Sequence, residues 1–215
     1  MIHWARLVLG EERVDYLYGG NCVADIAGAI AARFADASSA ISAIDRNVSR
    51  QARIVVDRLV PHLPVHRFEI APRESRKRLG AIEELLAFAV ERGADRSSIV
   101  VAMGGGLVEN GAGLAAALLY RGARLARLPT TPVAAFDAVL SQKQVINLIR
   151  GKNLCGAYHR PSFIGCDLLW LSSAPRRDLI TGVAEMAKNV IAVAPRPEQD
   201  FAAAVAALAT GQSSP

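Results

Sequence analysis

Residues 97–113, SSIVVAMGGGLVENGAG, decide the fold class of this chain. The apolar run predicts a buried strand at 97–106 that runs into three glycines. Glycines at the end of a strand let the backbone approach a phosphate closely, and the N-terminus of a following helix presents free N–H groups. The spacing departs from a strict G-x-G-x-x-G fingerprint, so glycines needed for a tight turn or close packing are the alternative. We favour a phosphate-binding turn.

Outward from this stretch, segments with helical spacing alternate with short apolar runs. We expect strands at 39–45, 65–72, 97–106 and 123–131, and helices at 21–36, 48–63, 79–94 and 112–122. This alternation predicts an α/β fold, with a Rossmann-like parallel sheet and helices on both faces. A helix beginning near Asp178 and an alanine-rich helix at 200–209 follow. We therefore expect a nucleotide-binding domain at 1–170, the start of a truncated helical C-terminal domain at 171–209, and a disordered tail at 210–215.

Composition narrows the possible partners. The 215 residues are 52% hydrophobic, enough for a sizeable core, and the net charge of +5 suits anionic ligands. Aromatic residues make up only 6%, and no basic stripe is interleaved with them, so we expect no nucleic-acid binding. No apolar run reaches the roughly eighteen residues of a membrane span, and the N-terminus is a poor signal peptide. The three cysteines lack a C-x-x-C pair, which favours a cytoplasmic protein without a cysteine-rich zinc site.

Polar residues follow two of the predicted strands. Asp45, in DRNV, stands where an acidic side chain can accept hydrogen bonds from ribose hydroxyls, or it caps a helix. Glu74 and Lys77, in PRESRK, precede a helix, and an exposed ion pair in a turn is their simplest interpretation.

Two further segments carry charged residues. Lysines in 129–153 could bind phosphate or polarise a carbonyl, although lysine usually marks a solvated loop. Glu185 and Lys188 share a helix face, as a surface ion pair or with the glutamate as a metal ligand. In RGKNLCGAYHRP (150–161), the glycines and the proline exclude a helix that would bring Cys155 and His159 together.

Taken together, these motifs resemble the sugar phosphate cyclase family, which includes 3-dehydroquinate synthase. The resemblance runs from about residue 15 to residue 193. The motifs occur in the family's order and closely match its spacing. They are DRNV at 45–48, RESRK at 73–77, GGGLVEN at 104–110, Arg121-Gly122, Pro129-Thr130-Thr131, Asp137 to Lys143, GKNLCG at 151–156 and AEMAK at 184–188. Two motifs depart from the family pattern: RESRK has arginine in place of glycine, and GGGLVEN ends in Asn110 instead of aspartate. The stretches at 114–131 and 137–147 look closer to 2-deoxy-scyllo-inosose synthases, enzymes of aminoglycoside antibiotic biosynthesis.

The resemblance implies a lyase that turns a sugar phosphate into a carbocycle. Bound NAD would accept a hydride from a ring carbon, phosphate would leave by elimination, and the hydride would return before an aldol step closes the ring. Glucose 6-phosphate is the substrate that the subfamily implies, and a seven-carbon acid phosphate is the alternative if the chain is a 3-dehydroquinate synthase. A divalent metal, zinc or cobalt, and a homodimer are implied as well.

The family's site residues carry over onto matching positions. Those implied to hold NAD are Asp45, Asn47, Glu74, Lys77, Gly105, Gly106, Asn110, Thr130, Thr131, Lys143, Lys152, Trp170 and Ser173. Those implied to face the substrate are Asp137, Lys143, Asn153 and Lys188, with Arg121 reaching the phosphate from a neighbouring subunit.

The metal site implied by the family is incomplete. Glu185 is the implied ligand, but none of the four histidines, His3, His62, His66 and His159, matches the two histidine ligands of the family. The alternative to a cyclase is therefore a non-catalytic NAD-binding remnant or partner subunit.

Overall fold

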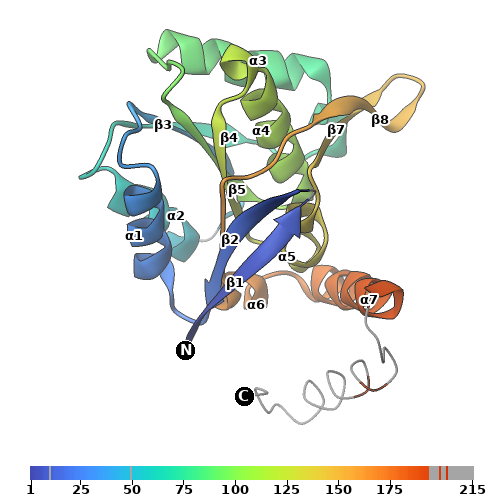
Figure 1. Ribbon diagram of the computed structural model, residues 1–215. Coiled ribbons are helices and arrows are strands. Elements are labelled where there is room, and N and C mark those ends of the chain that lie inside the picture. Colours follow the sequence, from blue (N-terminus) through green and yellow to red (C-terminus); the bar gives the residue numbers. More distant parts are fainter. Residues whose placement is uncertain (10, 49, 194–198, 200–201, 203–215) are drawn as a thin grey trace.

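Seven strands form one twisted sheet in the computed structural model, which describes residues 1–9, 11–48, 50–193, 199 and 202 (Figure 1). Six strands are parallel, and the edge strand β1 is antiparallel to β2. In spatial order the strands are β1 (Ile2–Leu9), β2 (Glu12–Gly19), β9 (Phe163–Asp167), β6 (Arg124–Pro129), β5 (Ile99–Gly104), β3 (Ala40–Asp45) and β4 (Val65–Ile70). The predicted α/β fold with a Rossmann-like sheet is confirmed.

Helices cover both faces of the sheet, as predicted. On one face, α1 (Val23–Arg33) and α2 (Arg50–Leu59) pack on strand residues such as Ile44 and Met103. On the other, α3 (Leu79–Glu91) and α4 (Gly106–Leu118) pack on strand residues such as Ile41. The strands β3 and β5 are buried along their whole length, which explains why their sequences are continuous apolar runs.

The helix after the glycines begins at Gly106, six residues before the predicted 112–122. Gly111, which precedes the predicted helix, and Gly113 both lie inside it. The reason is packing: a Cβ on Gly113 would lie 2.0 Å from Oε1 of Gln144, so glycine lets the helix approach β7 (Lys143–Leu148) closely. The helix ends at Leu118 and is followed by the 3-10 turn η2 (Leu119–Arg121).

Two hairpins were absent from the sequence prediction. The first is β1–β2, and the second joins β7 to β8 (Gly151–Tyr158) as a separate two-stranded sheet. Glycines in 150–161 had indicated a loop. Gly156 instead marks a close backbone approach, because a Cβ there would lie 2.0 Å from the carbonyl oxygen of Gln144.

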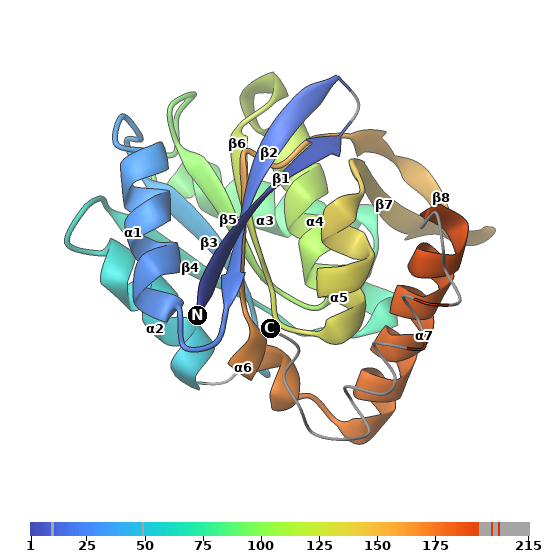
Figure 2. The same cartoon turned by 60° about the horizontal axis from the view of Figure 1, so that its bottom comes forward.

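The remaining helices lie at one end of the sheet. They are α5 (Pro132–Phe136), α6 (Leu168–Ser172) and α7 (Arg176–Val193). Two further 3-10 turns lie elsewhere in the chain: η1 (Glu74–Arg76) follows β4, and η3 (Ala138–Leu140) follows α5. Helix α7, predicted to begin near Asp178, runs beside α5 (Figure 2), and Gly182 makes this possible since a Cβ there would lie 2.1 Å from Pro132. Apart from residue 202, the alanine-rich stretch at 200–209 and the tail at 210–215 lie outside the described residues. None of the described helices is long and apolar enough to cross a membrane.

A candidate dinucleotide pocket and the groups around it

The chain changes direction between β3 and β5. From β3 it crosses to β4 on one side, and from β4 it returns to β5 on the other side of β3. Such a switch point leaves a crevice outside the carboxyl ends of the two strands, where open α/β sheets bind ligands. Asp45 and Gly104 end these two strands, so the fold places them at this crevice.

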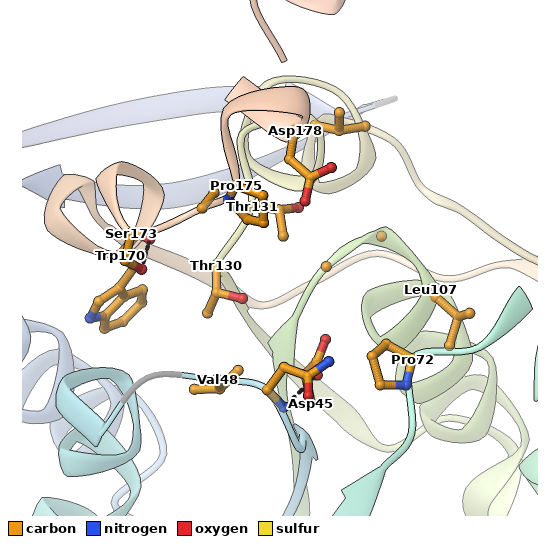
Figure 3. Close-up of a pocket in the computed structure, with 15 residues that line it drawn as sticks. Asp45, Val48, Pro72, Leu107, Thr130, Thr131, Trp170, Ser173, Pro175 and Asp178 are labelled. Atoms are coloured by element: carbon orange, nitrogen blue, oxygen red, sulfur yellow. Dashed lines mark hydrogen bonds between the residues drawn. The ribbon is translucent and has the colours of Figure 1, made fainter. Parts of the chain in front are cut away.

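The crevice holds a cavity of about 430 Å³ (Figure 3). Trp170 lies at one end of it, and Pro72 and Leu107 lie at the other. Eight residues that the family resemblance assigned to NAD line this cavity: Asp45, Asn47, Gly105, Gly106, Thr130, Thr131, Trp170 and Ser173. The sequence analysis did not assign Asp178, which also lines it; an acidic residue in the first turn of a helix was the available signal.

The glycines at the pocket floor permit close packing, and the helix that follows them has no side-chain cap. A Cβ on Gly104 would lie 2.8 Å from Cβ of Val108 and 2.9 Å from Cβ of Asp45, so no larger residue fits. Gly105 is the N-cap of α4, and no side chain caps this helix end. The first N–H groups of α4 therefore lie beside the pocket without a side-chain acceptor, an arrangement suited to a phosphate.

Asp45 is buried at the pocket edge. Its Oδ1 accepts a hydrogen bond from the Asn47 N–H at 2.8 Å. Burial raises the pKa of the Asp45 carboxyl, opposed by the backbone N–H groups of Asn47 and Gly105. Because α2 begins only at Arg50, Asp45 does not cap it, and that alternative is wrong.

Glu74, Lys77, Lys152 and Asn153 form a second polar cluster, between η1 and the β7–β8 hairpin. The Lys77 ammonium donates to Oδ1 of Asn153 at 2.6 Å, and that of Lys152 lies 3.9 Å from Oε1 of Glu74. In these contacts the polar partners are therefore Asn153 for Lys77 and Lys152 for Glu74, and the predicted ion pair between Glu74 and Lys77 is wrong. Burial lowers the pKa of the Lys77 ammonium, and the negative charge of Glu74 opposes this shift.

Asn147 joins this cluster and was missed by the sequence analysis. It is 7% exposed and bonds to residues in both segments. A polar residue after the apolar Val145 and Ile146 was the only signal in the sequence.

Asn110 has a different place from the one expected. Its side chain donates to the Gly106 carbonyl at 2.7 Å and accepts from the Val145 N–H at 3.2 Å. It does not line the cavity, and it ties α4 to β7 instead.

Three charged residues meet where α7 packs near the end of α5. Lys188 lies 3.3 Å from Oδ1 of Asp137 and forms an ion pair with Glu185, which confirms the surface-pair interpretation of the AEMAK motif. Among residues 1–9, 11–48, 50–193, 199 and 202, no group of three or more His, Cys, Asp or Glu side chains could hold a metal. One carboxylate that already pairs with a lysine does not fit the three-ligand requirement of a catalytic zinc.

Four further residues that the sequence singled out lie outside the main cavity. Lys143 is exposed at the start of β7, where it and Asn153 line a groove of about 260 Å³ along the hairpin. Arg121 precedes β6 and so lies near the end of the sheet opposite the pocket. His159 bonds to the Ala123 carbonyl at 2.9 Å, and Cys155 packs against the core, so these two form no joint site.

A buried ion pair joins β6 to α4 and was also missed. The Arg127 and Glu109 side chains are fully buried and bonded to each other. Burial raises the pKa of Glu109 to about 7, against the opposing effect of the Arg127 charge. Neither residue stands in a motif, so no local pattern indicated the pair.

Comparison with known proteins agrees with this geometry. A family model described as 3-dehydroquinate synthase N-terminal matches residues 67–181. The 2-deoxy-scyllo-inosose synthase of Micromonospora echinospora is 38% identical over 188 residues, which are 87% of this chain and 47% of that protein. That of Streptomyces fradiae is 37% identical over 195 residues, 88% of this chain and 44% of that protein.

Solved structures show the same relationship. A crystal structure of 2-deoxy-scyllo-inosose synthase complexed with carbaglucose-6-phosphate, NAD⁺ and Co²⁺ has a TM-score of 0.82 at 32% identity, over 87% of this chain and 52% of that one. The 2-epi-5-epi-valiolone synthase of Streptomyces hygroscopicus subsp. jinggangensis 5008, with NAD⁺ and Zn²⁺ bound, has a TM-score of 0.68 at 28% identity, over 84% and 50% of the two chains. The present chain thus spans about half the length of the relatives it matches.

Proposed function

The chain belongs to the 3-dehydroquinate synthase family, and on this premise we propose that it binds NAD for a sugar phosphate cyclase of the 2-deoxy-scyllo-inosose synthase type. The cavity between β3 and β5 carries this proposal. It combines a buried carboxylate (Asp45), an uncapped helix N-terminus at Gly105 and an aromatic wall (Trp170). These three features match the ribose, the diphosphate and the base of a dinucleotide.

Each group has a separate task in this proposal. Asp45 accepts hydrogen bonds from ribose hydroxyls, and the first N–H groups of α4 bind the diphosphate. Lys152 and Asn153, at the start of β8, contact the far end of the cofactor and the substrate. Bound NAD supplies reversible hydride acceptance at a ring carbon of glucose 6-phosphate. Lys143, Asp137 and Lys188 orient the sugar phosphate and stabilise charge on its oxygens.

A divalent metal at this site would need further ligands in addition to Glu185. The Lys188 ammonium already pairs with that carboxylate, and no three-ligand cluster exists among the residues the structure describes. We therefore derive no step through a metal from these residues.

Fluorescence tests NAD binding directly, since the chain has two tryptophans and one lines the pocket. Trp4→Phe removes the exposed tryptophan and leaves Trp170 as the sole reporter. We expect saturable quenching when NAD is added, and weaker binding in the Asp45→Asn variant of the same protein. Fluorescence that is unchanged by NAD, together with no heat of binding in calorimetry, would contradict the proposal.

Phosphate release identifies the reaction. The protein is incubated with NAD, Co²⁺ or Zn²⁺, and either glucose 6-phosphate or a seven-carbon acid phosphate. Release from glucose 6-phosphate that a chelator abolishes supports the inosose-type cyclase, whereas release only from the acid phosphate supports 3-dehydroquinate synthase.

A second candidate function is NAD binding without turnover, as a partner subunit. The pairing of Glu185 with Lys188 favours it, because this pairing leaves no free carboxylate at the expected metal position. NAD binding with no phosphate release from either substrate would support this candidate over the cyclase.

Assembly and location complete the proposal. We propose a homodimer, because Arg121 lies away from the pocket of its own chain and could reach a substrate only in a neighbouring subunit. Light scattering measures the mass, and a monomer at micromolar concentration would contradict the proposed homodimer.

We also propose that the protein is cytoplasmic, since all three cysteines are free, and that it binds no nucleic acid, since aromatic residues are few.

A further inference from the structure

Asn147 connects two segments that are far apart in the sequence. Its backbone N–H donates to the Lys77 carbonyl at 2.8 Å, and its Nδ2 donates to Oε1 of Glu74 at 2.7 Å. Its Oδ1 accepts from the Asn153 N–H at 2.9 Å. Both side-chain atoms and the backbone N–H of one buried residue thus hold η1 against the β7–β8 hairpin.

The hairpin end that Asn147 holds has an unusual backbone. Asn153 has a φ of 57°, in the left-handed region, which asparagine adopts more readily than most residues. The bond from its N–H to Asn147 and the bond from Lys77 to its side chain both stabilise this conformation. Without the first bond, nothing else that the structure describes satisfies the Asn153 N–H.

The charged members of the cluster cannot fix this geometry by themselves. The side chains of Lys152 and Glu74 are 75% and 53% exposed, and their charged atoms are 3.9 Å apart. Exposed ion pairs of this kind contribute little to holding a structure in place. The buried amide of Asn147 makes shorter, directional bonds to both sides, so it sets the relative position of the two segments.

We propose that Asn147 is a positioning residue, which fixes Glu74 and the Lys152-Asn153 pair relative to each other so that they meet the same end of the bound dinucleotide. The identity of that ligand rests on the proposed function. Asn147, like Glu74, Lys152 and Asn153, does not line the cavity, and in this proposal it acts by holding those three residues in place.

A pair of substitutions separates positioning from a general effect on stability. Asn147→Asp keeps an acceptor for the Asn153 N–H, but it removes the donor and places a carboxylate against Glu74. We expect the Kd for NAD to rise about tenfold in this variant, but less than about threefold when Glu74→Gln is the background, because the Gln amide can donate to the new carboxylate. An equal factor in both backgrounds would overturn the positioning role.

Asn189→Asp provides the matched control. It makes the same chemical change on α7, where Asn189 donates to the Phe136 carbonyl at 2.6 Å. We expect its Kd for NAD to equal that of the unchanged protein within about twofold. A loss equal to that of Asn147→Asp would show that an Asn→Asp change away from the cluster also weakens binding, and the inference would fail.

Amide hydrogen exchange tests the link without any ligand. In the unliganded protein, Asn147→Ala should speed exchange at the Asn153 N–H, with exchange in the central strand β5 unchanged. Unchanged exchange at Asn153 would overturn the inference even if NAD binds. If the unchanged protein binds no NAD, the proposed function fails and the cofactor role of Asn147 fails with it, while the exchange result still decides whether Asn147 holds the turn.

Discussion

Arg127 donates from Nε to Oε2 of Glu109 across 2.7 Å, and both side chains are fully buried. The other end of the guanidinium donates from Nη1 to the carbonyls of Ala138 and Ser141, at 2.9 and 3.2 Å. These carbonyls lie between Asp137 and Lys143, two residues that we propose to face the substrate. One buried cation therefore joins β6, α4 and the segment that carries both.

Removing one partner of this ion pair should strongly lower the stability of the protein. Arg127→Met leaves the Glu109 carboxyl buried without its cation, and we expect the free energy of unfolding to fall by about 3–5 kcal/mol. The double variant Glu109→Met/Arg127→Met contains no buried charge at either position, so it should lose less than Arg127→Met alone. Urea unfolding at pH 8 measures both. A double variant that is less stable than Arg127→Met would contradict the assignment.

The same pair predicts a pH dependence of stability. Burial raises the pKa of Glu109 to about 7 in the folded state, above the ordinary value of 4.5. The folded protein therefore holds a proton that the unfolded chain releases, so this contribution to stability is complete below about pH 4.5 and is lost as the pH rises to about 7. The unfolding free energy of the unchanged protein relative to Glu109→Gln should fall over this range. A difference that stays constant between pH 5 and 8 would show that the carboxyl is not titrating there.

Gly106→Ala should separate ligand binding from folding. A Cβ at Gly106 would meet only Ala138, at 3.8 Å, so the fold accepts it. Gly106 lines the pocket at the proposed diphosphate site, so we expect the added methyl group to hinder the ligand. We expect unchanged or slightly higher thermal stability and a Kd for NAD that is at least about tenfold higher, equivalent to about 1.4 kcal/mol.

Gly28→Ala is the control for that experiment. Gly28 is exposed in α1, and a Cβ there would meet nothing within 4 Å. Replacing it should raise stability by about 1 kcal/mol through helix propensity and leave the Kd unchanged. If both variants bind NAD like the unchanged protein, the diphosphate does not lie at the N-terminus of α4.

Asp45 predicts how NAD affinity depends on pH. Burial raises the pKa of its carboxyl, so the group should protonate at a higher pH than an ordinary aspartate. Protonation removes an acceptor for the ribose hydroxyls, and the Kd for NAD should therefore rise as the pH falls. Asp45→Asn should bind weakly at every pH, with a flat profile by calorimetry. A profile in the variant as steep as that of the unchanged protein would assign the titration to another group.

Four of the six parallel strands were predicted from local sequence, whereas β2, β9 and the hairpin β7–β8 were not. Strands such as β5 (Ile99–Gly104) are continuous apolar runs because helices cover both faces of the sheet, so their pattern is visible in one short window. The hairpin β7–β8 contains Gly151, Asn153 and Gly156, residues that normally indicate loops. Its strands form because Gly156 lets two backbones approach, and that is a property of the pair and not of either segment.

The family motifs located most of the candidate site, but the sequence could not show which residues share a cavity. Eight of the residues assigned to NAD line one pocket, since the carboxyl ends of neighbouring parallel strands meet at one edge of the sheet. Asn110 was assigned by its motif alone, and in the structure its amide oxygen accepts a hydrogen bond from the Val145 N–H.

The sequence by itself determined the α/β class, the glycine turn after β5 and the family, because apolar periodicity and short motifs are local properties of the chain. Only the tertiary structure decided that Asn147 bonds to Glu74, 73 residues away, and that Arg127 is buried against Glu109. Those contacts depend on how distant segments pack. A buried polar group must find a partner wherever the fold provides one, and no local pattern in the sequence records where that partner lies.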